Sequence, residues 1–292
     1  MKVINRAYLS EIYDKNENLK MLYEVLTDIK GIRNIDELTY LIVIVRVIIK
    51  KTLRRDLLPA YLASRDFLVK VKSRERSIFY CPAKTDALLH IMPYFERRTW
   101  EVMKSIIKRG DVFIDVGAYI GTYSIAIAHK VGPSGIVISL EPSPMYHILC
   151  KNIKINRLEN CIALKKAAWS KSTHLELYYN PQRAGTSSFF KEWQPYVLKS
   201  IKVEAKPLDD ILEEVGYPIS KIKLLKIDVE GSEVEVLKGA SNTISITDYI
   251  IFETSKRMLN DCLQLLSSNF KVSFIEGTGP TYNFLACRIN QK

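Results

Sequence analysis

The sequence lacks the cysteine and histidine patterns of secreted or zinc-binding proteins. Its five cysteines are odd in number and scattered, with no Cys-x-x-Cys pair, and none of the four histidines stands at metal-ligand spacing. The sequence therefore predicts free buried thiols in a reducing compartment and no structural zinc.

Long apolar runs are also absent. The first ten residues have no extended apolar core behind Lys2 and do not resemble a secretory signal. The most apolar stretch, residues 41–49, contains Arg46, whereas a membrane-spanning helix needs about 20 apolar residues. We therefore expect a cytoplasmic protein without a membrane span.

Acidic residues are scarce in one part of the chain. Residues 1–110 hold 22 Lys and Arg against 13 Asp and Glu, whereas the remainder holds 21 against 19. This asymmetry favours contact with an anionic membrane surface, an anionic glycan or, as a weaker candidate, nucleic acid. A solvated basic face explains it equally well. Peripheral attachment to a membrane is thus the alternative to a free cytoplasmic protein.

From Asp111 onward, short β-branched runs alternate with helical stretches, as in βαβ units. Seven strands are predicted, at residues 112–115, 135–140, 162–166, 222–227, 249–252, 271–275 and 282–288. The last two are joined by a short loop and form an antiparallel hairpin. The prediction is an α/β, Rossmann-like fold with a mostly parallel seven-stranded sheet and a terminal antiparallel hairpin.

Two segments lie outside this alternation. Residues 175–212, between the third and fourth strands, form a long insertion with strand-like pieces at its two ends, and such insertions usually shape ligand sites. Ahead of the sheet, residues 16–29 and 38–58 have helical patterns, and the second either packs on the larger domain or lies on a membrane surface. We expect a basic, mainly helical extension over residues 1–80 and the α/β domain over 81–292.

The turn after the first strand predicts a nucleoside-type ligand. Asp115 ends the strand, and Gly117 and Gly121 follow where the chain turns sharply into a helix beginning at Thr122. A dinucleotide pyrophosphate requires Gly-x-Gly-x-x-Gly, and here Tyr119 replaces the second glycine. The bulky residue favours a ligand without a pyrophosphate, such as S-adenosylmethionine; a tight turn without a ligand is the alternative.

Later strand ends extend this site. Glu141 ends the second strand, where a carboxylate can accept hydrogen bonds from both ribose hydroxyls of a nucleoside. Ala168 follows the third strand and leaves room for an adenine ring. Lys226, Asp228 and Glu230 cluster at the end of an otherwise apolar central strand, where ligands bind in such sheets. A surface glutamate, a structural alanine and ordinary acids at a helix start are the respective alternatives.

Several of these stretches together resemble the FkbM-type methyltransferase family. They are residues 114–124, 141–144, Asn152 with Asn156, 208–210 and 225–240. The resemblance runs from about Tyr94 to Phe252 and implies a class I methyltransferase fold, S-adenosylmethionine as donor, and transfer to a hydroxyl oxygen of a sugar, polyketide or other small acceptor. Tyr119 departs from the asparagine that the family usually has there.

The expected roles follow from this reading. The donor would be bound by Asp115, Gly117, Tyr119, Gly121, Thr122, Glu141 and Ala168. Asp228 is the candidate general base or orienting group, with Glu230 beside it and Lys226 tuning their charge. A divalent cation held by the two acids is the less favoured alternative.

Two other functions stay open. The basic N-terminal third suggests an RNA ribose 2′-O-methyltransferase. Methylation of a base is not indicated, because no Asn-Pro-Pro-Tyr-like motif is present and Cys81-Pro82 reverses the order of a Pro-Cys nucleophile. The second alternative is a non-catalytic module on a membrane or scaffold, against which the intact glycine turn and the two acids count.

Overall fold

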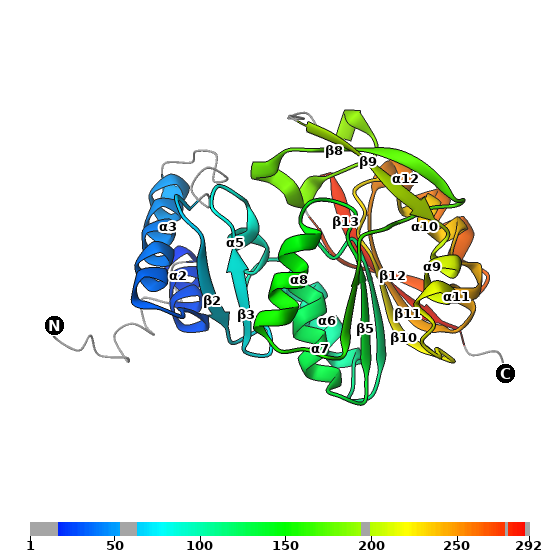
Figure 1. The fold of residues 1–292 in the computed structure, drawn as a ribbon, viewed down its shortest axis with the longest axis horizontal. Coiled ribbons are helices and arrows are strands. Elements are labelled where there is room, and N and C mark those ends of the chain that lie inside the picture. Colours follow the sequence, from blue (N-terminus) through cyan, green and yellow to red (C-terminus); the bar gives the residue numbers. More distant parts are fainter. Residues whose placement is uncertain (1–16, 53–62, 194–198, 278–279, 290–292) are drawn as a thin grey trace. The chain divides into compact units, whose positions relative to one another are not determined.

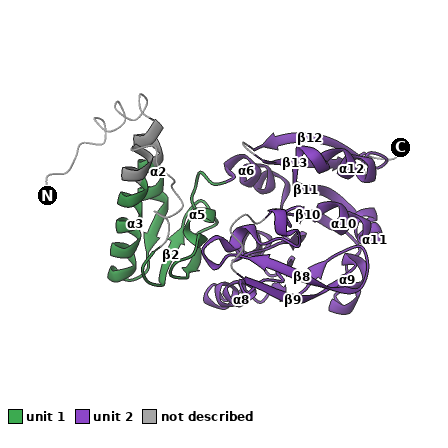
Figure 2. Ribbon diagram, turned by 90° about the horizontal axis from the view of Figure 1, so that it is seen from above, with its two compact units in different colours: residues 1–95 green, residues 96–292 purple. Residues whose placement is uncertain are grey.

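The computed structural model describes residues 17–52, 63–193, 199–277 and 280–289. The chain divides into two compact units, residues 1–95 and 96–292, coloured separately in Figure 2. The boundary therefore falls between Phe95 and Glu96, downstream of the expected position at residue 80. The predicted helical stretch 38–58 runs past the described part, and Arg54 and Arg55 lie outside it.

Unit 1 combines helices with a small sheet. Its elements are α2 (Glu17–Asp28), β1 (Ile29–Gly31), α3 (Asn34–Thr52), β2 (Phe67–Val71), β3 (Ser77–Cys81) and α5 (Ala87–His90). The strands form an antiparallel sheet in the order β1-β2-β3, against which α3 packs. The sequence analysis predicted the helices and missed this sheet, because strands of three to five residues are too short to show a periodicity.

Unit 2 contains the predicted seven-stranded sheet. Its strands are β4 (Val112–Val116), β5 (Ile136–Leu140), β6 (Cys161–Leu164), β10 (Ile222–Ile227), β11 (Thr247–Ser255), β12 (Phe270–Glu276) and β13 (Thr281–Arg288), in the order β12-β13-β11-β10-β4-β5-β6. Strand β13 runs antiparallel to both neighbours, and the pairs from β11 through β6 are parallel. The mostly parallel sheet with a terminal antiparallel hairpin is thus confirmed.

Helices cover both faces of this sheet (Figure 1). On one side lie α6 (Arg97–Ile106), α7 (Thr122–Val131) and α8 (Tyr146–Ile155); on the other lie α9 (Leu208–Val215), α10 (Glu233–Lys238), α11 (Ser241–Ser245) and α12 (Lys256–Leu266). Each face has its own apolar core, with Phe113 and Leu224 on the α6 side and Ile114 and Leu225 on the α12 side. Because the central strands are buried on both faces, a charged residue within one of them requires a specific explanation.

The insertion between β6 and β10 forms a second sheet. It consists of β7 (Ala167–Ala168), β8 (Thr173–Tyr179) and β9 (Lys199–Lys206), in the order β7-β9-β8, with short 3₁₀ turns η1 (Pro181–Thr186) and η2 (Lys191–Trp193). Both strand-like pieces expected there are present. The Ser188 hydroxyl donates to the backbone oxygen of Glu230 at 2.7 Å, which fastens the insertion to the loop after β10.

Candidate active site

Charged residues meet at the carboxyl ends of three neighbouring strands. Asp115 of β4 lies opposite Lys226 of β10 in the parallel register. Side chains two residues apart in a strand share a face, so Asp228 follows Lys226 on the α6 side. Phe252 of β11 pairs with Ile227, which brings Glu253 level with Asp228. The sheet register therefore brings Glu253 to the charged residues that the sequence had already indicated.

Lys226 and Asp228 form an ion pair of unequal exposure. The Lys226 Nζ lies 2.8 Å from the Asp228 Oδ2, and the two side chains are 3% and 24% exposed. The ammonium also lies 4.9 Å from the centre of the Tyr123 ring. Burial alone would lower the pKa of Lys226, but the charges of Asp228, Asp115 and Glu96 outweigh it and raise that pKa above its ordinary value. The lysine is therefore a permanent buried cation behind an accessible carboxylate.

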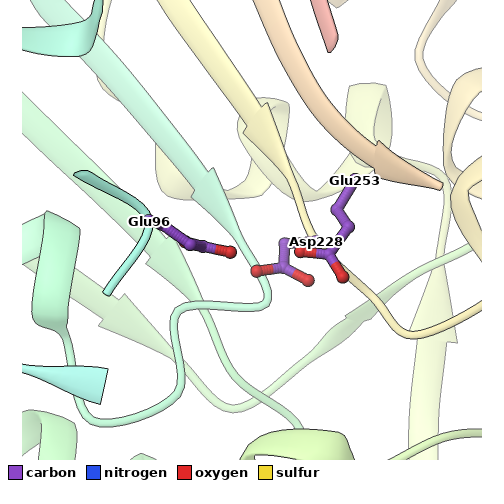
Figure 3. A group of neighbouring side chains, drawn as sticks. All are labelled: Glu96, Asp228 and Glu253. Carbon is purple, nitrogen blue, oxygen red and sulfur yellow. The ribbon is translucent and has the colours of Figure 1, made fainter. Parts of the chain in front are cut away.

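Three carboxylates surround this point. Figure 3 shows Glu96, Asp228 and Glu253 pointing toward one another, and one oxygen from each lies within 4.8 Å of the others. Glu96 precedes α6 and accepts hydrogen bonds from the Tyr123 hydroxyl and from Asn283 Nδ2, the latter at 3.3 Å. Burial, and then the charges of Asp228 and Glu96, raise the pKa of Glu253 well above its usual range.

Sequence reasoning missed Glu96 and Glu253. Glu253 directly follows a predicted strand, so the rule that identified Asp228 could also have identified it. Glu96 precedes a helix and is far from the motifs in sequence, so only the fold brings it to the site. Carboxylate oxygens are the ligands that a hard divalent cation prefers, but one of the three carboxylates, Asp228, is already paired with the Lys226 ammonium.

Glu230 and Glu233 form the second acidic part of the site. Glu230 adopts a left-handed backbone conformation, with φ of +50°. Burial raises its pKa well above the usual range, and the charge of Asp228 adds to the effect. Glu233 is 2% exposed, accepts the Gly231 N–H at 2.9 Å, and has a pKa raised by burial to about 7. Protonation is therefore favoured at both residues next to Asp228.

The turn after β4 presses against the loop after β10. Gly117 has φ of +87°, and a Cβ placed on it would lie 1.8 Å from the Asp228 backbone oxygen. The Asp228 N–H in turn donates to the Val116 oxygen at 2.9 Å. Glycine is therefore required here by the contact between two loops of the site, in addition to its left-handed conformation.

Tyr119 and Glu141 are joined across the same turn. The Tyr119 N–H donates to Glu141 Oε2 at 2.7 Å, and the Ser143 N–H donates to Oε1 at 2.8 Å. Burial of Glu141 raises its pKa, and these bonds oppose the shift. The φ of Tyr119 is +54°, a region that asparagine tolerates better than most residues.

A hollow that is partly open to solvent lies beside this turn. It is lined by Val116, Gly117, Leu140, Pro142, Lys166, Ala167, Ala168, Phe189 and Val229. The lining is mostly apolar, and the adjacent Glu141 carboxylate, which the N–H groups of Tyr119 and Ser143 hold in place, is a hydrogen-bond acceptor beside it. The residues present therefore fit a nucleoside, with the base in the hollow and the ribose hydroxyls on Glu141.

Two further candidate donor-binding groups lie buried next to the turn. Asp115 accepts the Ser124 hydroxyl at its Oδ2, at 2.5 Å, while its Oδ1 has no hydrogen-bond partner among the described residues. The Thr122 Oγ1, in the first turn of α7, likewise has none there. A buried polar atom left unpaired is costly, so both oxygens are suited to a polar ligand group.

A comparison of the sequence with known families decides the class. The profile described as "Methyltransferase FkbM domain" matches residues 115–272, which include Gly117, Glu141, Asp228 and Glu253. The chain belongs to the FkbM methyltransferase family. Membership confirms the expected methyltransferase activity and S-adenosylmethionine as the methyl donor.

Individual relatives are similar over part of their length. Methyltransferase sdnD of Sordaria araneosa is 29% identical over 192 residues, 56% of this chain and 73% of that protein. Hexuronic acid methyltransferase AglP of Haloferax volcanii is 30% identical over 145 residues, 49% of this chain, which spans 55% of that protein. The solved structure of an O-methyltransferase from Thermotoga maritima has a TM-score of 0.44 at 12% identity, covering 74% of this chain and 75% of its own.

Proposed function

We propose that this FkbM methyltransferase transfers its methyl group to a hydroxyl oxygen of a sugar, a glycan or another small-molecule acceptor. The observation that carries the proposal is the Lys226–Asp228 pair at the end of the central strand. The carboxylate is accessible and the ammonium behind it is not, which is the arrangement that a general base for a hydroxyl needs.

The residues divide the work between donor and acceptor. When bound, S-adenosylmethionine supplies a methyl group on a sulfonium leaving group. Glu141 and the hollow at Ala168 hold the nucleoside end. Asp228 accepts or orients the acceptor's hydroxyl proton, and Lys226 holds this carboxylate in position through their ion pair. Alignment of the hydroxyl oxygen with the methyl group is then the main contribution of the site.

A polyhydroxylated acceptor suits the surroundings of Asp228. Glu96 and Glu253 add acceptor oxygens for neighbouring hydroxyl groups within a few ångströms. The insertion borders the donor hollow through Phe189 and is fastened to the Glu230 backbone through Ser188. The similarity to a protein named as a hexuronic acid methyltransferase supports the same class of acceptor.

Transfer of label from methyl-labelled donor tests the proposal. The full chain would be incubated with neutral hexoses, with hexuronic acids and with RNA, and the products treated with mild alkali. We expect label in a sugar, in a form that survives alkali, because an ether at a hydroxyl is stable and a methyl ester at a carboxyl is hydrolysed. Label only in RNA, or only in an alkali-labile ester, would contradict the assignment.

A further inference from the structure

Helix α3 of unit 1 is apolar on both of its faces. The inner face packs on β1 and β2 and buries Tyr40, Val43, Ile44 and Val47. The outer face carries five large apolar side chains: Ile35 (40% exposed), Leu38 (53%), Leu41 (37%), Ile42 (51%) and Val45 (54%). Between Asn34 and Val47, the other exposed residues are Asn34 and Arg46. We call these five residues the outer face of α3.

Such a face is unusual for a helix in contact with water. A helix that covers a sheet normally has an apolar stripe toward the sheet and charged or polar residues opposite. The spacing of Ile35, Leu38, Ile42 and Val45 repeats every three or four residues, so these side chains form one continuous stripe. Contiguous exposed apolar surface of this kind marks an interaction site.

The net charge of unit 1 indicates what covers the stripe. Residues 1–95 hold 17 Lys and Arg against 11 Asp and Glu. Arg46 is exposed one helical turn after Ile42, and the sequence continues with Lys50, Lys51, Arg54 and Arg55. A second copy of the chain would bring two surfaces of the same sign together. An anionic lipid surface instead attracts each of these cations and accepts the apolar side chains.

We propose that the outer face of α3 docks unit 1 on an anionic lipid bilayer. The helix lies in the plane of the interface, with Leu38, Ile42 and Val45 inserted between the headgroups and with Arg46 at headgroup level. Among the helices that the structure describes, none has the length and apolar character needed to cross a bilayer. Helix α3 itself contains Asp36 and Glu37 in its first turn and Arg46 within it, as expected for an interfacial helix.

Binding of the full chain to vesicles tests this inference. The protein would be sedimented with two kinds of vesicle. One is pure phosphatidylcholine, and the other contains about 30–40% phosphatidylglycerol, which gives it a negative surface potential. The variant Leu38→Ser/Ile42→Ser/Val45→Ser removes the centre of the stripe. The matched control Tyr217→Ser/Leu265→Ser removes apolar side chains that are 41% and 38% exposed in unit 2.

We expect the wild type to bind the anionic vesicles more tightly than the neutral ones. The α3 variant should bind them at least about tenfold more weakly, because three apolar side chains no longer leave water on docking. The unit 2 control should bind like the wild type, and circular dichroism should show equal helix content and thermal midpoint in all three proteins. Equal binding by the wild type and the α3 variant would overturn the proposal. So would a wild-type dimer in sedimentation equilibrium that the α3 variant dissociates while vesicle binding stays unchanged.

Discussion

The Lys226 ammonium lies 2.8 Å from the Asp228 carboxylate, and the lysine is buried while the aspartate is reached by solvent. The pair is therefore directional. Lys226 lies opposite Asp115 on β4, and the charge of Glu96 also raises its pKa, so one buried cation interacts with several acids. Of these acids, Asp228 combines the ion pair with a partly exposed position beside the Gly117 turn.

Removal of the cation should slow the reaction more than it weakens donor binding. In Lys226→Met the length of the side chain is kept, but the ion pair that holds Asp228 in position is lost. Turnover should then fall by about tenfold or more, while the affinity for S-adenosylmethionine stays close to that of the wild type. Lys223→Met, on the same strand but paired with Asp248, is the matched control and should keep both quantities. Normal turnover in Lys226→Met would mean that the lysine only stabilises the fold.

Donor affinity should depend on Glu141. Truncation in Glu141→Ala removes the acceptor of two backbone N–H groups and of the proposed ribose bonds. We expect S-adenosylmethionine to bind more weakly by about 1–3 kcal/mol in calorimetry, the scale of hydrogen bonds to a charged group. Glu235→Ala, a partly exposed acid on α10, should bind the donor normally. Undiminished affinity in Glu141→Ala would refute the assignment of the ribose site.

Turnover should not require a divalent metal ion. Glu96, Asp228 and Glu253 could together offer oxygen ligands, but the Lys226 ammonium already supplies the positive charge at Asp228. We therefore expect the same turnover in excess chelator and in added Mg²⁺. A loss of turnover on chelation that Mg²⁺ reverses, and a weaker Mg²⁺ response in Glu253→Gln, would show instead that the three carboxylates hold a metal.

Glu233 should make the unfolding free energy of the protein depend on pH. Its folded-state pKa of about 7 lies above the ordinary 4.5, so the folded protein holds this proton between these pH values and the unfolded chain does not. The unfolding free energy of the wild type should therefore rise relative to Glu233→Gln as the pH falls from 7 to 4.5, by at most about 1.4 kcal/mol per pH unit. Urea unfolding of both proteins at several pH values measures the difference. A constant difference would place the pKa of Glu233 in its usual range.

Most of unit 2 could be predicted because its strands are buried on both faces. Stretches such as 222–227 are mostly apolar, and the two lysines within this one, Lys223 and Lys226, contrast with their neighbours. The short strands of unit 1 have no such contrast with their surroundings. The outer face of α3 could not be predicted either, because the sequence does not tell whether an apolar side chain faces a sheet or water.

The site could be predicted where it follows a strand and could not where the fold alone makes the contact. Asp228 and Glu141 end predicted strands, whereas Glu96 joins them from the start of α6. For Gly117, the sequence predicted a glycine at a turn but not the reason for it, since the Asp228 backbone oxygen occupies the space that a Cβ would fill. Gly117→Val should therefore disturb the fold of both loops, and Glu141→Ala is the cleaner probe of donor binding.

The most direct test of the account compares turnover and donor affinity in Asp228→Asn, measured on the same preparation. Asparagine keeps the shape of the side chain and can still accept a hydrogen bond from Lys226, but it cannot take up the hydroxyl proton. With the acceptor identified by label transfer, turnover should fall by about 10² to 10⁴, the usual contribution of a general base, while S-adenosylmethionine binds as in the wild type. Asp248→Asn, which alters a partly exposed ion pair remote from the glycine turn, should leave both quantities unchanged. Normal turnover in Asp228→Asn, or a loss of donor affinity that matches the loss of turnover, would contradict the role of Asp228 as the base for the acceptor.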